Sequence, residues 1–162
     1  DPTNTTRTMQ VAVLLTLLLP VCCWSYHYQA PVAFHACLTT DAHYLGRHHV
    51  LPFDRVITDS RRGYIRHSGS YRIPVTGYYV ITWVTPVLGN IPLELVVNGQ
   101  QRGRTAPASP KGEGKTQSTT GVAVLFLHRG DIVSIRTNPD HHPIGYVVNN
   151  EWQDCCLSLW GI

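Results

Sequence analysis

The sequence is poor in charged residues and has almost no lysine. Asp, Glu, Lys and Arg make up 14% of its 162 residues, and Lys111 and Lys115 are its two lysines. The formal net charge of +3 is small for a nucleic-acid-binding protein, which usually carries a basic stripe and a much higher isoelectric point. The hydrophobic fraction of 43% is ordinary, which excludes a disordered chain. We expect one folded domain and no nucleic-acid partner.

Helical periodicity and catalytic motifs are also absent from the sequence. No segment combines a sustained helical period with capping residues, and there is no internal repeat or collagen period. The Gly-x-Ser-x-Gly and His-Glu-x-x-His patterns of common hydrolases are missing, and Cys37 has no local signature of a nucleophile. We therefore expect a protein that is not an enzyme.

A single long hydrophobic run begins at Met9 and ends at Pro20, and it is too short to cross a bilayer as a helix. Cys23 and Ser25 are small residues at the third and first positions before a possible cleavage site after Ser25. This arrangement is typical of a secretory signal peptide. We expect a signal peptide at residues 9–25, a short segment at 26–30 and one globular domain at 31–162. Residues 1–8 precede the one methionine and are interpreted as untranslated or additional. The sequence thus predicts a secreted, extracellular protein with no membrane insertion.

Removal of such a leader leaves three cysteines, Cys37, Cys155 and Cys156, an odd number for an oxidising compartment. One intrachain bridge with a spare thiol is the simplest outcome, and an intermolecular bridge is the alternative. Cys155 and Cys156 are adjacent and would point to opposite faces of a strand, so we do not expect them to pair with each other.

Regularly spaced glycines separate runs of β-branched and aromatic residues, which predicts short strands joined by turns. The turn pair Asn98-Gly99 closes one such run. Strands at 122–127 and 132–137 are expected to form a hairpin, and the polar stretch at 100–119 a long exposed loop. The result is a single β-sandwich of about ten short strands. Strands are expected at residues 32–38, 77–85, 93–97, 122–127, 132–137, 146–148 and 157–160.

Five motifs, in order, resemble the globular head of complement C1q. Together they cover most of residues 31–162. They are Ala33-Phe34-His35-Ala36, the segment from Phe53 to Asp59, the segment from Gly69 to Tyr79 with its Pro-x-x-Gly-x-Tyr corner, Leu95 to Gly99, and Val124 to Val133.

The resemblance implies a ten-stranded jelly-roll sandwich, shared with the tumour necrosis factor superfamily, and assembly as a homotrimer. No Gly-x-y stalk separates Ser25 from Pro31, so the chain is similar to the head-only secreted form found in bivalve molluscs. The last strand departs from the family's aromatic and glycine-rich ending. In this fold the first and last strands are neighbours, which implies a Cys37–Cys156 disulfide with Cys155 as the spare thiol.

Several short motifs have plain structural explanations. Arg129-Gly130-Asp131 spells an adhesive tripeptide, but the resemblance places this Gly-Asp in a turn that requires it. Gly114-Lys115-Thr116 lacks the first glycine and the helix of a phosphate loop. The paired histidines at 48–49 and 141–142 lack metal-site spacing, so we interpret them as exposed loop residues. No cofactor is predicted. Calcium remains open, because some relatives bind it between subunits and three aspartates, Asp41, Asp59 and Asp140, fall near expected loops.

Two groups of basic residues are the predicted ligand-binding residues for anionic groups, because the arginine fork matches carboxylate and phosphate. Ordinary solvated charge is the alternative interpretation for both groups. The first group surrounds one turn and comprises Arg61, Arg62 and Arg66; the second lies in the expected long loop and comprises Arg102, Arg104, Lys111 and Lys115.

These expectations favour a secreted, trimeric recognition protein of innate immunity that binds microbial surface glycans or lipopolysaccharide. Trimerisation would turn weak single-site contacts into avidity. A cytokine-like or adhesive ligand for a host receptor is the second hypothesis, since one fold supports many functions. An extracellular calcium- or metal-binding matrix protein is the third, suggested by the nine histidines.

Overall fold

The computed structural model describes residues 30–107 and 114–162, so the predicted signal peptide and Lys111 lie outside the described residues. Residues Pro31–Ile162 form one compact unit. No helix in the described residues is long and apolar enough to span a membrane. The elements are β1 (Ala33–Cys37), β2 (Arg55–Asp59), β3 (Tyr64–Ile65), the 3-10 helix η1 (Arg66–Ser68), β4 (Ser70–Arg72), β5 (Gly77–Asn90), β6 (Leu93–Val97), β7 (Gln100–Thr105), β8 (Thr116–Leu127), β9 (Ile132–Thr137), β10 (Ile144–Val147) and β11 (Cys156–Gly161).

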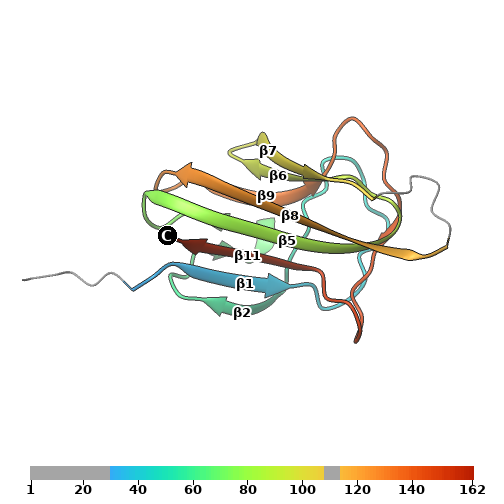
Figure 1. Cartoon of the computed structure of the whole chain (residues 1–162), viewed down its shortest axis with the longest axis horizontal. Coiled ribbons are helices and arrows are strands. Elements are labelled where there is room, and N and C mark those ends of the chain that lie inside the picture. Colours follow the sequence, from blue (N-terminus) through green and yellow to red (C-terminus); the bar gives the residue numbers. More distant parts are fainter. Residues whose placement is uncertain (1–29, 108–113) are drawn as a thin grey trace, which may run out of the picture. The chain divides into compact units, whose positions relative to one another are not determined.

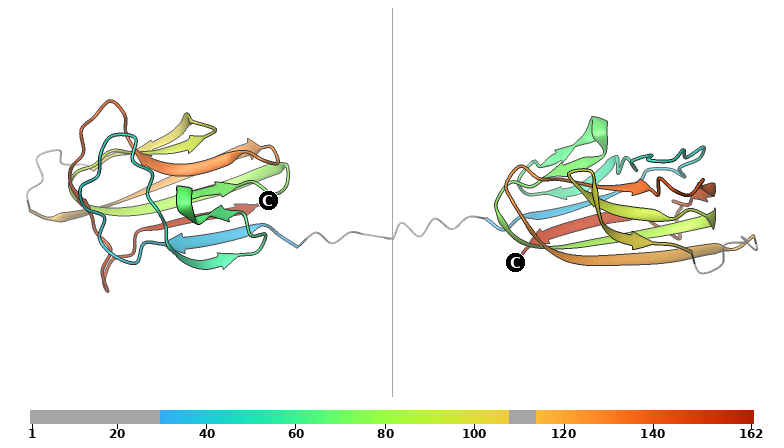
Figure 2. Two further views of the ribbon diagram at one scale, coloured as in Figure 1. Left: turned by 180° about the vertical axis from the view of Figure 1, so that it is seen from behind. Right: turned by 90° about the horizontal axis from the view of Figure 1, so that it is seen from above.

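The strands form two antiparallel sheets that pack face to face (Figures 1 and 2). In sheet A, β8 pairs with one side of β5, β10 and β11 pair with its other side, and β1 and β2 follow after β11. Sheet B has the order β3-β4-β9-β6-β7. The first and last strands, β1 and β11, are neighbours with Cys37 opposite Cys156. The predicted jelly-roll sandwich is confirmed, with eleven strands where ten were expected.

The long strand β5 contains a proline because it changes partners there. β11 pairs with β5 up to Val84, and β10 pairs with it from Val87 onward. Pro86 lies between these two partners, where its missing N–H removes no ladder hydrogen bond on that side. Its carbonyl oxygen accepts a hydrogen bond from the N–H of Val148 at 2.8 Å. The gap between β11 and β10 therefore lets β5 contain a proline, which would interrupt the hydrogen bonds to a continuous neighbouring strand.

Trp83 connects the two sheets at the centre of the core. Its side chain is 1% exposed, and its Nε1–H donates to Thr105 Oγ1 on β7 at 3.1 Å. A Cβ atom at Gly121 would lie 2.0 Å from the indole ring, and one at Gly103 would lie 2.9 Å from it. The ring therefore fills space that only glycine leaves on β8 and β7, and a larger residue at Gly121 would overpack the core.

Two sequence predictions about connections are wrong. β8 and β9 do not form a hairpin, because β8 pairs with β5 in sheet A and β9 pairs with β4 and β6 in sheet B. The turn between them carries the chain from one sheet to the other. Half of the expected loop at 100–119 is strand, since β7 spans Gln100–Thr105 and β8 begins at Thr116. Both segments are polar because one side faces solvent, which hides their strand character in the sequence.

Candidate functional site

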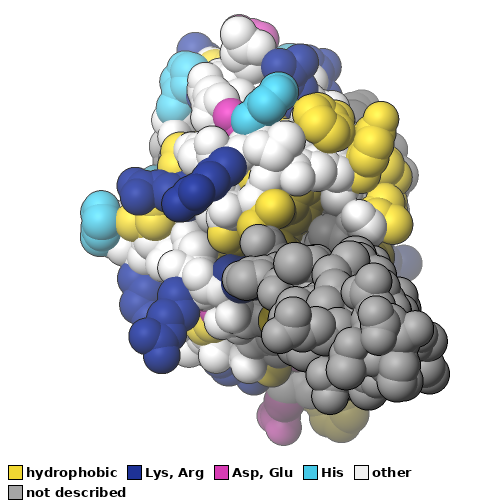
Figure 3. Space-filling model, turned by 90° about the vertical axis from the view of Figure 1, so that its left-hand side faces the viewer, with side chains coloured by type: hydrophobic (Ala, Val, Ile, Leu, Met, Phe, Trp, Pro, Cys, Tyr) yellow, Lys and Arg dark blue, Asp and Glu magenta, His cyan; other side chains and the backbone are white. Residues whose placement is uncertain are grey.

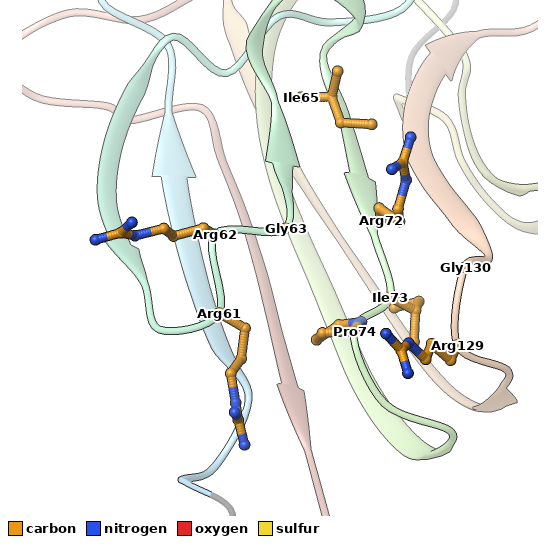
Figure 4. Close-up of a pocket in the computed structure, with 9 residues that line it drawn as sticks. All are labelled: Arg61, Arg62, Gly63, Ile65, Arg72, Ile73, Pro74, Arg129 and Gly130. Carbon is orange, nitrogen blue, oxygen red and sulfur yellow. The ribbon is translucent and has the colours of Figure 1, made fainter.

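A surface pocket of about 280 Å³ brings basic residues from three segments together. The segments are the turn between β2 and β3, the end of β4, and the turn between β8 and β9. Figure 4 shows the pocket with its lining side chains. The residues that line it are Arg61, Arg62, Gly63, Ile65, Arg72, Ile73, Pro74, Arg129 and Gly130.

The first turn is held by the side chain of Asp59 at the end of β2. Its two carboxylate oxygens accept hydrogen bonds from the backbone N–H groups of Gly63 and Tyr64, both at 3.0 Å. Arg62 takes a left-handed conformation, with φ of 52°. A Cβ atom at Gly63 would lie 2.6 Å from the carbonyl oxygen of Arg72, so the turn can approach β4 only because residue 63 is glycine.

Three backbone hydrogen bonds of 2.8 Å join the three segments. The N–H of Arg72 donates to the Gly63 carbonyl, the N–H of Ile73 to the Asp131 carbonyl, and the N–H of Gly130 to the Ile73 carbonyl. The short segment after β4 therefore connects both turns. Residues that are far apart in the sequence are fixed next to one another by backbone geometry rather than by their own side chains.

Two carboxylates lie close to pocket residues in the sequence, and both already accept hydrogen bonds from groups of the protein. Asp59 binds the turn amides, as described above. Asp131 accepts hydrogen bonds from the N–H of His128 and from Asn98 Nδ2, both at 2.8 Å. These two bonds, the backbone one first, hold the pKa of Asp131 below its usual value, with a smaller contribution from nearby Arg102. The carboxylate of the Arg-Gly-Asp tripeptide thus stabilises the turn in which it lies.

The arginines surround the pocket without converging on one point. Arg129 lies beside Pro74, while the other three point in different directions around the rim (Figure 4). Guanidinium groups bind carboxylate, sulfate and phosphate groups by paired hydrogen bonds. An arrangement spread in this way suits an extended anion with several charged groups better than one small ion.

The structure separates the predicted basic residues into different surroundings. Arg66 lies in η1 and donates to the Asp54 carbonyl at 3.0 Å, outside the pocket. Arg102 and Arg104 are exposed on β7, not in a loop, and donate to Gln100 and Gln101. Lys115 is exposed just before β8, and Lys111 lies outside the described residues. The structure brings together Arg61 and Arg62, but none of the other predicted residues that it describes lines their pocket.

Sequence reasoning missed two arginines that line the pocket. Arg72 is brought beside Gly63 by the pairing of β3 with β4, in which Tyr64 faces Tyr71. A short hairpin around the Ser68-Gly69 turn could have been inferred from the sequence, and it would have placed Arg72 there. Arg129 carries no such signal, because its position depends on the chain crossing between sheets.

A second surface is the outer face of sheet A, which is apolar. Its exposed side chains alternate with the buried ones along β5, β8 and β11. The residues facing out include Tyr78, Val122, Val124, Phe126 and Trp160, which are 42–63% exposed. Figure 3 shows hydrophobic and basic side chains gathered on different sides of one end of the molecule.

The cysteines follow the predicted pairing. Cys37 and Cys156 form a disulfide between β1 and β11, and Cys155 is a free thiol with no exposed surface. Burial first, and the nearby Asp154 second, raise the pKa of Cys155 to about 12. A buried and protonated thiol does not suit an intermolecular bridge, so the structure favours the spare-thiol alternative.

The paired histidines at 48–49 and 141–142 are exposed in loops, as expected. In the described part of the chain, three metal-ligating side chains meet once, at His35, Cys37 and Cys156, and neither histidine pair takes part.

Comparison with known families matches residues 33–158 to the C1q domain. The chain is 31% identical over 98 residues to a complement C1q subcomponent chain of Bos taurus, covering 59% of this chain and 39% of that protein. It is 27% identical over 114 residues to a different complement C1q subcomponent chain, of Homo sapiens, covering 70% of this chain and 45% of that protein. The chain thus spans less than half the length of these two relatives.

Solved structures with the same fold include the globular domain of zebrafish complement 1qA protein, with a TM-score of 0.63 at 17% identity over 81% of this chain and 97% of that one. Murine APRIL matches with a TM-score of 0.58 at 15% identity over 82% and 99% of the two chains. At these low sequence identities, the comparison shows that the fold is shared.

Proposed function

Because this chain belongs to the C1q domain family, we propose that it is a secreted, non-catalytic recognition protein that binds anionic groups on microbial surfaces as a homotrimer. The observation that carries the proposal is the basic pocket between the β2–β3 and β8–β9 turns. Four arginines line it, and the nearby carboxylates of Asp59 and Asp131 are bound to amides. A positive surface with its own acids occupied favours negatively charged partners.

The apolar outer face of sheet A supports the trimer. Contiguous exposed apolar surface of this kind usually marks a protein–protein interface. Tyr78 and Phe126 face each other on β5 and β8 with ring centroids 5.0 Å apart, and Val124 lies opposite Val80 in the next row of the same face. If identical chains cover this face and leave the pocket open on each protomer, three weak sites could act together on a repetitive surface.

Binding to lipopolysaccharide vesicles tests the ligand side of the proposal. We expect the triple variant Arg61→Gln, Arg62→Gln, Arg129→Gln to bind about tenfold more weakly, equal to about 1.4 kcal/mol. Wild-type binding should also fall as salt is raised, since the contacts are ionic.

A control of equal charge uses Arg47→Gln, Arg66→Gln and Lys115→Gln, three exposed positions outside the pocket. If both triple variants lose the same affinity, net charge alone governs binding and the pocket is not the site. Saturable binding to host cells with none to vesicles would favour the receptor-ligand hypothesis. Stoichiometric calcium in the purified protein would favour the matrix hypothesis.

A further inference from the structure

The disulfide on the outer face of sheet A has a histidine beside it. His35 lies two residues before Cys37 on β1, so both side chains emerge on the same face of the sheet. His35 Nε2 is 3.7 Å from Cys37 Sγ. The ligating atoms of His35, Cys37 and Cys156 all lie within 4.8 Å of one another.

The imidazole is held with one nitrogen turned toward the sulfurs. His35 is the register partner of Ser158 on β11, and its Nδ1 is 2.8 Å from Ser158 Oγ. When Nδ1–H donates to this hydroxyl, the Nε2 lone pair faces the sulfur of Cys37. Metal-binding histidines are oriented in the same manner, with the second ring nitrogen donating to a fixed acceptor.

We propose that the reduced form of this cluster binds Zn²⁺ through His35 Nε2 and the thiolates of Cys37 and Cys156, with water in the fourth position. In a tetrahedral site with Zn–S of about 2.3 Å and Zn–N of about 2.0 Å, ligand atoms lie about 3.5–3.8 Å apart. The distance from His35 Nε2 to Cys37 Sγ already has this value. After reduction the two sulfurs must separate to about 3.8 Å, and the histidine can stay in place.

The redox step is a two-electron thiol–disulfide exchange. A dithiol reductant gives two electrons and two protons to the Cys37–Cys156 bond and leaves as its own disulfide. The two new thiols then lose their protons to solvent as Zn²⁺ binds, because the thiolate is the metal ligand. The bridged form offers no thiolates, so the disulfide and the metal exclude each other.

The surroundings of the cluster suit a neutral metal complex. One Zn²⁺, two thiolates and a neutral imidazole carry no net charge, and β1 and β11 contain no Asp, Glu, Lys or Arg. Arg55 on β2 is the register partner of Cys37, and its charge is balanced by Asp154 at 2.6 Å. In the single chain His35 and Cys156 are half-buried, so metal and water can reach them from the outer face as long as other chains do not cover it. Cys155 is excluded from the site because its side chain is buried on the opposite side of the strand. The site does not depend on the ligand proposed above.

Titration with Co²⁺, a coloured substitute for zinc, tests the inference. The protein is reduced without oxygen, freed of reductant and titrated while visible absorption is recorded, with Cys155→Ser as the background that removes the buried thiol. We expect one Co²⁺ per chain with thiolate charge-transfer bands, displaced by one equivalent of Zn²⁺, and no binding by the oxidised protein. Ser158→Ala should weaken binding about 10–100-fold, and His35→Ala at least as much.

His128→Ala removes an exposed histidine elsewhere and should leave the titration unchanged. Circular dichroism before and after reduction shows whether the sandwich persists. Loss of the sheet on reduction would overturn the inference, because the ligands meet only in the folded protein. Absence of thiolate bands, or equal affinity for the wild type and His35→Ala, would overturn it as well.

Discussion

The two outer faces of the sandwich share one core but differ sharply in charge. In sheet A, the strands β1, β5, β8, β10 and β11 contain no Asp, Glu, Lys or Arg, and the charged residues of the sheet are Arg55 and Asp59 at the two ends of β2. Sheet B has the opposite character, and its charged residues are Arg72, Arg102, Arg104 and Arg136, with Glu94 as its one acid. The difference shows that the small number of charged residues is unevenly distributed between the two sheets.

The single acid of sheet B is used inside the molecule. Glu94 is 1% exposed and accepts hydrogen bonds from Arg136 at 3.2 Å and from Asn138 Nδ2 at 2.6 Å. The neighbouring Arg104 faces it across the β6–β7 pair but donates to Gln101 instead. The basic face therefore presents Arg72, Arg102 and Arg104 to solvent without an exposed acid in any of its strands.

Placing a charge on the apolar face should have the largest effect. Val124→Glu changes a residue that is 59% exposed in the single chain, so the fold should change in stability by about 0.5 kcal/mol or less. In a trimer sealed by this face, the buried carboxylate should weaken association by several kcal/mol. Light scattering at fixed concentration should then report a monomer where the wild type is a trimer.

Ile144→Glu provides the matched control, because Ile144 is 65% exposed but lies on β10, away from this cluster. A wild-type monomer, or a trimer that survives Val124→Glu, would disprove the role given to this face.

Removing the buried acid of the basic face should have an intermediate effect. Glu94→Gln leaves Arg136, which is 18% exposed, without its ionic partner, and breaking such a pair destabilises a protein by about 3 kcal/mol. The free energy of unfolding in urea measures this loss. Arg55→Gln breaks the exposed Arg55–Asp154 pair and should change it by less than about 1 kcal/mol. Similar losses in the two variants would contradict the contrast drawn between buried and exposed pairs.

The smallest expected effect is on the free energy of unfolding, from a change to a buried hydroxyl in the core between the two sheets. The hydroxyl of Tyr71 is buried without a hydrogen-bond partner among the described residues, and burial raises its pKa above the usual 10.0. Burial also raises the pKa of Tyr64 and of Cys155 to about 12 each. The unfolded chain releases these protons at lower pH than the folded one. Stability should therefore be complete below about pH 9 and should decline from there through pH 12.

Tyr71→Phe removes the unpaired hydroxyl and should raise the free energy of unfolding at pH 7 by about 1 kcal/mol. Its decline at alkaline pH should be shallower than that of the wild type. Urea midpoints at several pH values measure both effects. A less stable variant at pH 7 would mean that the hydroxyl has a partner in solution.

Much of the fold could be predicted from local patterns. β6 and β9 occupy the predicted residues, because runs of β-branched and other apolar residues define them and the Asn98-Gly99 turn ends β6. At this turn both φ angles are positive, 50° and 81°, as a tight hairpin requires. Ordered motifs identified the sandwich and, through the pairing of its first and last strands, the Cys37–Cys156 bridge.

The remaining features depend on contacts between distant segments. A Gly-Asp turn can close a hairpin or lead from one sheet to the other, and local sequence does not distinguish these outcomes. The basic pocket was predicted in part, through Arg61 and Arg62, because they are adjacent in the turn. Arg129 joins them only through the backbone bonds between Ile73 and the β8–β9 turn, which no spacing rule reveals.

The edge strand β8 has a consequence for how this protein must be made. It runs for 12 residues, pairs with β5 alone, and contains neither a charge nor a proline. Proteins usually protect such an edge with lysine, proline or a bulge, because an open edge recruits strands from other chains and starts aggregation. The exposed edge of β8 can therefore pair with a strand of another chain. At high protein concentration such pairing would compete with folding and lower the yield of soluble protein.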